Sequence, residues 1–206
     1  MSYPQPMHGS SSIAAFQFVA FLSLVLLLGL AGEWLNALLL YQREAILQGQ
    51  IWRLLSGHVV HLGWMHTVMN ILALSLVVWL FRGALSKASW CIGGSLISLS
   101  ISISFLALKP HLSYYGGLSG TIHGLITMAC IGCLVKDAIL PRWQAAVVLL
   151  LLFAKLFYEH TPWYNSDFLQ EAMDAPVIID AHLYGAIAGL VIGSLTSLKV
   201  IVKNLV

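Results

Sequence analysis

The chain has 206 residues, of which 59% are hydrophobic and only 9% are charged. A soluble domain usually carries about 25% charged residues, so this composition excludes an ordinary soluble domain and predicts an integral membrane protein. The net charge of +2, with no basic run, argues against a nucleic-acid-binding protein.

Apolar stretches of the length that a bilayer requires, about 20 residues, follow one another along the chain. They lie at roughly 13–35, 65–82, 88–108, 119–136, 142–159 and 179–202. The first has no Lys or Arg before it and is too long for a signal peptide, so we expect it to remain as a span. The pattern predicts an all-α membrane protein in which residues 1–206 form one six-helix domain.

Two of the connecting segments are long and polar. Residues 41–64 mix charged residues and histidines with tryptophan and leucine, which is typical of a loop at the membrane interface. Residues 160–178 form a second, acidic loop. The other connections and the C-terminus hold most of the basic residues: Arg82, Lys87, Lys136, Arg142, Lys199 and Lys203. The positive-inside rule makes that side cytoplasmic, so both termini are predicted to be cytoplasmic and both long loops to face outward.

Glycine recurs at every fourth residue in two of the predicted spans. Gly116, Gly120 and Gly124 recur around the start of the fourth span, and Gly185, Gly189 and Gly193 recur in the sixth. Ridges of small residues let two helices approach closely in lipid. We therefore expect spans four and six to pack together, which would bring Ser119 near His182.

Ser119 and His182 are polar residues at the outward ends of these two apolar spans. Gly117 and Gly120 flank the serine in a backbone that can turn sharply, and a helix N-terminus presents free N–H groups to a developing oxyanion. A serine and a histidine together meet the requirement for a nucleophile and a base, without a carboxylate as a third group. The pair predicts hydrolysis.

His66 and Asn70 lie four residues apart, on one face of the second span at its outward end. Both can donate hydrogen bonds, which suits an oxyanion hole. The alternative is that they cap this helix and hold the 41–64 loop. The two residues alone leave both interpretations open.

Four motifs now occur in order along the chain: Trp52-Arg53, His66-x-x-x-Asn70, Gly117-x-Ser119-Gly120 and His182-x-x-Gly185-x-x-x-Gly189. Together they resemble the motifs of the rhomboid intramembrane serine proteases. The resemblance implies a rhomboid-like bundle with Ser119 as nucleophile and His182 as general base and then acid. It also implies an oxyanion hole of His66, Asn70 and the Ser119 amide, and a structural role for Trp52-Arg53 in the interfacial loop.

His123 departs from the family pattern, because rhomboids commonly carry an aromatic residue four positions after the serine. The departure puts the usual ring stacking beneath the catalytic histidine in doubt, and His123 could either hydrogen-bond to His182 or only pack. The histidine and the compact size are similar to the rhombosortase subfamily, whose members are associated with proteins that carry C-terminal Gly-Gly-type membrane anchors. This resemblance implies transmembrane protein substrates and a bacterial inner membrane.

Other classes of protein remain as alternatives. A non-catalytic rhomboid-like protein would bind or escort membrane helices, and a haem protein would need paired histidines among His66, His123 and His182. The histidines His58, His61 and His66 could bind a metal, but capping and headgroup contacts are commoner, and no H-E-x-x-H motif is present. We expect neither metal nor cofactor, and we expect the acidic loop and span five to gate lateral entry of a substrate.

Overall fold

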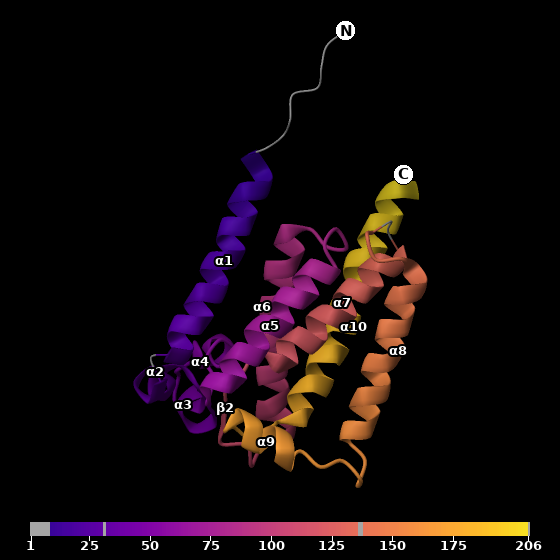
Figure 1. The fold of residues 1–206 in the computed structure, drawn as a ribbon. Helices are drawn as coiled ribbons and strands as arrows, with labels where there is room; N and C mark the ends of the chain where they lie inside the picture. The colour runs from indigo at the N-terminus through magenta and orange to yellow at the C-terminus, as the bar shows by residue number, and fades with distance from the viewer. Residues whose placement is uncertain (1–8, 31, 136–137, 206) are drawn as a thin grey trace.

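The computed structural model describes residues 9–30, 32–135 and 138–205, and the chain is mainly helical (Figure 1). The long helices are α1 (Gly9–Leu30), α5 (Trp64–Leu80), α6 (Lys87–Leu108), α7 (Ser119–Val135), α8 (Arg142–Glu159) and α10 (Ile179–Leu205). The short elements are α2 (Gly32–Leu39), β1 (Tyr41–Gln42), α3 (Arg43–Leu47), α4 (Arg53–Ser56), β2 (Tyr114–Tyr115) and α9 (Asp167–Met173). The predicted all-α class is confirmed at this level.

Two helices in the described part of the chain are both long and apolar enough to cross a bilayer, Lys87–Leu108 and Ile179–Leu198. Phe18–Gly29, α5 and α7 are apolar but shorter. These helices support an integral membrane protein, while six membrane crossings stay a prediction.

The first long helix ends at Leu30, several residues before the predicted boundary near residue 35. A separate helix, α2, starts at Gly32, whose φ of +60° lies in the left-handed region that favours glycine. This backbone conformation is incompatible with a continuing α-helix, so the chain changes direction there.

The long helices stand side by side, with α1 at one edge of the bundle and α8 at the other (Figure 1). The start of α1 and the end of α10 lie at the same end of the molecule, and the short helices α2, α3 and α9 gather at the opposite end (Figure 1). Helix α7 is the most enclosed, because most of its residues are buried among α5, α6, α8 and α10. The residues just before α7 and in its first turn are therefore surrounded by the rest of the fold.

Helices α7 and α10 pack backbone to backbone through the two glycine ridges. A Cβ atom on Gly120 would lie 2.7 Å from the carbonyl oxygen of Ala181, and one on Gly124 would lie 2.5 Å from that of Gly185. A Cβ atom on Gly189 would in turn meet the carbonyl oxygen of Gly124. These separations leave no room for side chains, and they confirm the prediction that spans four and six pack against each other.

The 41–64 segment is joined to the residues that lead into α7. Strands β1 and β2 pair antiparallel, with Tyr41 opposite Tyr115 and Gln42 opposite Tyr114. The Arg43 amide extends this pairing by donating to the Ser113 carbonyl at 2.9 Å. The loop thus holds the backbone only a few residues before Ser119.

Trp52 and Arg53 bind the carbonyl groups around the C-terminal end of α2. The guanidinium of the buried Arg53 donates to the carbonyls of Leu40 at 2.8 Å and Ala37 at 2.9 Å, and the Trp52 indole donates to Leu38 at 3.2 Å. The last carbonyls of a helix have no partner within the helix, so these contacts satisfy them. The two residues connect α4 to α2 in the same loop.

Replacing Gly185 with alanine tests the close contact between α7 and α10. The added Cβ would meet the carbonyl oxygen of Gly120, which is backbone and cannot move aside. We expect the Gly185→Ala protein to lose about 1–3 kcal/mol of stability, measured as a lower Tm in detergent. Gly94→Ala is the matched control, because its Cβ would meet only the Leu125 side chain at 3.9 Å. Equal Tm values for the two variants would contradict the contact.

Candidate active site

Ser119 is the first residue of α7 and follows a turn that only glycine fits. Gly117 has a φ of +142°, and a Cβ atom there would lie 2.8 Å from Cε1 of His66. The Tyr115 hydroxyl donates to the Gly117 carbonyl at 2.6 Å and fixes the turn. The serine is therefore presented at a helix N-terminus, where the backbone N–H groups lack partners within the helix.

His182 lies in the first turn of α10 and faces Ser119. Its Nε2 is 3.1 Å from Oγ of Ser119, which is a hydrogen-bonding distance, and its ring is buried. The close approach of Gly120 to Ala181 places the two helices so that these side chains meet. The two residues that the sequence predicts as a pair are adjacent in the structure.

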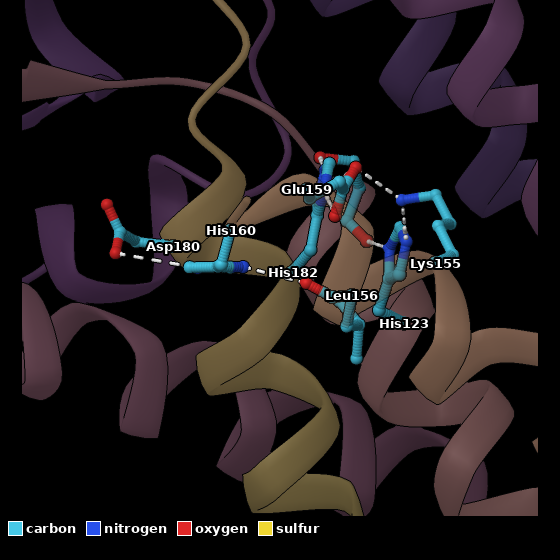
Figure 2. Close-up of polar contacts among 8 residues, drawn as sticks. His123, Lys155, Leu156, Glu159, His160, Asp180 and His182 are labelled. Carbon is cyan, nitrogen blue, oxygen red and sulfur yellow. Dashed lines mark hydrogen bonds and ion pairs between the residues drawn. The ribbon is translucent and has the colours of Figure 1, made fainter. Parts of the chain in front are cut away.

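A carboxylate stands behind the histidine. Both carboxylate oxygens of Glu159, the last residue of α8, lie 3.2 Å from Nδ1 of His182 (Figure 2). Lys155, one turn earlier in α8, donates to Oε1 of Glu159 at 2.6 Å. The sequence analysis predicted a pair of serine and histidine with no carboxylate as a third member, so it missed Glu159 and Lys155. The available signal was a lysine and a glutamate four residues apart in an apolar span, where charges are rare and usually functional.

The ring of His123 stacks on the ring of His182. The ring centroids are 4.1 Å apart and the planes differ by 13°. Nδ1 of His123 donates to the Ser119 carbonyl at 2.8 Å, and Nε2 is 3.0 Å from Nζ of Lys155 (Figure 2). The stacking that the departure from the family pattern put in doubt is present here with an imidazole ring, and the hydrogen bonds of His123 connect α7 to α8.

His66 and Asn70 are both buried on α5, and they lie one helical turn apart. The His66 ring lies against Gly117, beside the turn that precedes Ser119, and its Nδ1 has no hydrogen-bond partner in the described part of the chain. The Asn70 amide donates to the His66 carbonyl at 3.0 Å, one helical turn further along α5. An amide nitrogen carries two hydrogens, so Asn70 retains a second donor.

His58 and His61, between α4 and α5, form a polar cluster with the start of α7. Nε2 of His58 is 2.9 Å from Oγ of Ser102, and the Leu118 amide donates to Nε2 of His61 at 3.4 Å. Burial lowers the pKa of His58 to about 3, and burial together with the nearby His66 lowers the pKa of His61 to about 3. Both rings are therefore neutral at physiological pH, and they act as hydrogen-bonding groups that hold the loop to α6 and α7.

The family comparison is consistent with this arrangement. The family model of the rhomboid domain matches residues 48–199, about three quarters of the chain. The chain belongs to the rhomboid family. Rhomboids are integral membrane proteins, in general intramembrane serine proteases that act on transmembrane substrates within the bilayer. The comparison with curated proteins gave no match.

Proposed function

We propose that this rhomboid is an active intramembrane serine endopeptidase in which Ser119 is the nucleophile and His182 the general base. The observation that carries the proposal is the distance of 3.1 Å between Oγ of Ser119 and Nε2 of His182 at the junction of α7 and α10. A nucleophile within hydrogen-bonding reach of a base is the geometry of nucleophilic acyl transfer. A rhomboid that only binds helices would have no need of this pair.

In the proposed reaction, the Ser119 hydroxyl passes its proton to Nε2 of His182 as Oγ attacks the carbonyl carbon of the scissile peptide bond. The tetrahedral intermediate collapses when its C–N bond breaks and the proton moves from Nε2 to the leaving amine. Water then gives a proton to Nε2, its oxygen attacks the acyl ester, and Ser119 recovers the proton as the acid product leaves.

His66, Asn70 and the Ser119 amide are the proposed donors to the oxyanion. The support is local: His66 lies against the turn at Gly117, and Ser119 begins a helix whose first N–H groups point out of its end. A second donor of Asn70 remains after its bond to the His66 carbonyl. Charge on the carbonyl oxygen develops only in the transition state, where such donors are most effective.

The proposed substrates are proteins with a C-terminal Gly-Gly-type membrane anchor, as for rhombosortases, cleaved near the outward leaflet of a bacterial inner membrane. The chain would cross the bilayer six times with both termini in the cytoplasm. The basic residues of the short connections support this orientation, and so does the placement of the start of α1 and the end of α10 at one end of the molecule (Figure 1).

Labelling with a serine-directed fluorophosphonate tests the activity. We expect the purified protein to be labelled, and both Ser119→Ala and His182→Ala to abolish labelling, because the first lacks the nucleophile and the second lacks its base. Exposed Ser86→Ala, at the start of α6, is the control and should label like the wild type. Wild-type labelling no greater than that of Ser119→Ala is the result for a non-catalytic rhomboid.

The oxyanion hole is tested by Asn70→Ala. Removal of one donor typically lowers kcat by about 10²–10³-fold, and we expect a loss of that size with little change in KM. The measurement is cleavage of a transmembrane peptide in proteoliposomes, with the exposed Asn165→Ala as control. A loss confined to stability, with kcat unchanged in the folded fraction, would instead assign Asn70 to capping.

The substrate class is tested by co-expression with a secreted reporter that carries a C-terminal Gly-Gly-type anchor. We expect release of the reporter by the wild type and none by Ser119→Ala. A matched reporter in which leucines replace the two glycines should stay in the membrane. Equal release of both reporters would refute the Gly-Gly preference while leaving the protease activity intact.

A further inference from the structure

We propose that Glu159 is a positioning residue for His182, so that this rhomboid uses a Ser119–His182–Glu159 triad and not a dyad. The inference rests on the proposed function of Ser119 and His182. It concerns a residue that lies outside the four sequence motifs and on a third helix, α8.

The placement of the carboxylate is the first observation. Glu159 is only 4% exposed, and its two oxygens are both 3.2 Å from Nδ1 of His182. Burying an ionised carboxylate is costly unless it is paired and hydrogen-bonded, so such a residue is seldom a neutral detail of packing. Here both of its oxygens face the nitrogen of the histidine that points away from the serine.

The ammonium group of Lys155 beside Glu159 favours the ionised form of the carboxylate. Nζ of Lys155 lies 2.6 Å from Oε1, and the same ammonium group is 3.0 Å from Nε2 of His123 (Figure 2). A lysine and a glutamate one turn apart on a helix could pair at the surface without burying either group. Lys155 is 46% exposed while Glu159 is buried, so the carboxylate is turned inward to His182.

An ionised carboxylate only accepts hydrogen bonds, so Nδ1 of His182 must carry its hydrogen. In the neutral ring the other nitrogen, Nε2, is then the acceptor, and it lies opposite the Ser119 hydroxyl. Glu159 thus selects the tautomer that can take the proton of the nucleophile and stabilises the imidazolium that forms. The His123 ring stacks on the face of the His182 ring and so restricts its orientation.

The position of α8 therefore bears on the catalytic histidine. Beside the Glu159 contact, His160 at the end of α8 has Nε2 4.0 Å from the Asp180 carboxylate at the start of α10 (Figure 2). Asp180 also pairs with Lys109 at 2.7 Å. The same end of α8 therefore approaches α10 at two points, and a displacement of α8 would withdraw the carboxylate from His182.

Fluorophosphonate labelling rates test the triad, because the probe reports activation of the nucleophile directly. We expect Glu159→Gln to lower the maximal labelling rate by at least tenfold, and by up to about 10⁴-fold as in triads with an amide in place of the carboxylate, with little change in probe affinity. Glu159→Asp, which keeps the carboxylate, should recover at least tenfold relative to Glu159→Gln. The exposed Glu171→Gln is the matched control and should label like the wild type.

A loss below tenfold in Glu159→Gln, or an aspartate variant no faster than the glutamine variant, would overturn the triad. The wild type and Ser119→Ala report separately on the proposed function, since a failure there appears as absent wild-type labelling. Thermal unfolding of each variant shows that the rates belong to folded protein.

The tautomer can also be measured without relying on a variant at Glu159. In protein labelled with ¹⁵N-histidine at mildly alkaline pH, we expect the His182 signals to show a protonated Nδ1 and an unprotonated Nε2. Their loss in His182→Gln assigns them. A His182 ring protonated at Nε2 alone would refute the inference even if the enzyme is active.

Discussion

The contact on which the site depends is the packing of two glycine ridges in α7 and α10. A carbonyl oxygen of one helix lies where a side chain of the other would begin, as at Gly120 beside Ala181 and at Gly124 beside Gly185. In lipid, apolar burial gives no drive for helices to associate, so close van der Waals contact between backbones has to provide it. The same contact sets the distance between the first turn of α10 and the start of α7, and hence the distance between His182 and Ser119.

Around this contact lie several of the polar groups that the described part of the chain buries, among them Glu159 and His182. In apolar surroundings each unpaired donor or charge is unfavourable, and here these groups are paired with one another by hydrogen bonds and an ion pair. Glu159 is paired with Lys155 and His182, and His123 links the Ser119 carbonyl to Lys155. These connections fix the rings and carboxylate in one arrangement, which is the condition for preorganised chemistry.

The interfacial loop contributes from the other side of the serine. The β1–β2 pairing and the neutral ring of His61 hold the backbone before α7, and His58 contacts Ser102 on α6. Arg53 binds the carbonyl groups at the end of α2. Gly117 can then adopt its positive φ against His66. The loop thus shapes the turn that precedes Ser119, while α10 supplies the histidine that faces the serine and α8 the carboxylate that faces the histidine.

The sequence by itself determined the membrane class, the helical content and the residues at the junction of α7 and α10. Composition, the length of apolar stretches and the spacing of glycines at every fourth residue are properties of the sequence itself. They can be recognised without knowledge of the tertiary structure. They led to the pair of Ser119 and His182 and to the packing of their helices. The break at Gly32 was missed because the apolar run continues through it.

Only the tertiary structure decided which carboxylate lies beside Nδ1 of His182 and whether the ring of His123 stacks on it. Glu159 and His182 are 23 residues apart, separated by the 160–178 loop that contains α9. No spacing rule relates the last residue of one helix to the first turn of another. Lys155 and Glu159 were visible as charges in an apolar span, but the direction in which each side chain turns depends on how α8 packs against α7 and α10. This packing brings Glu159, which remains paired with Lys155, into contact with His182 as well.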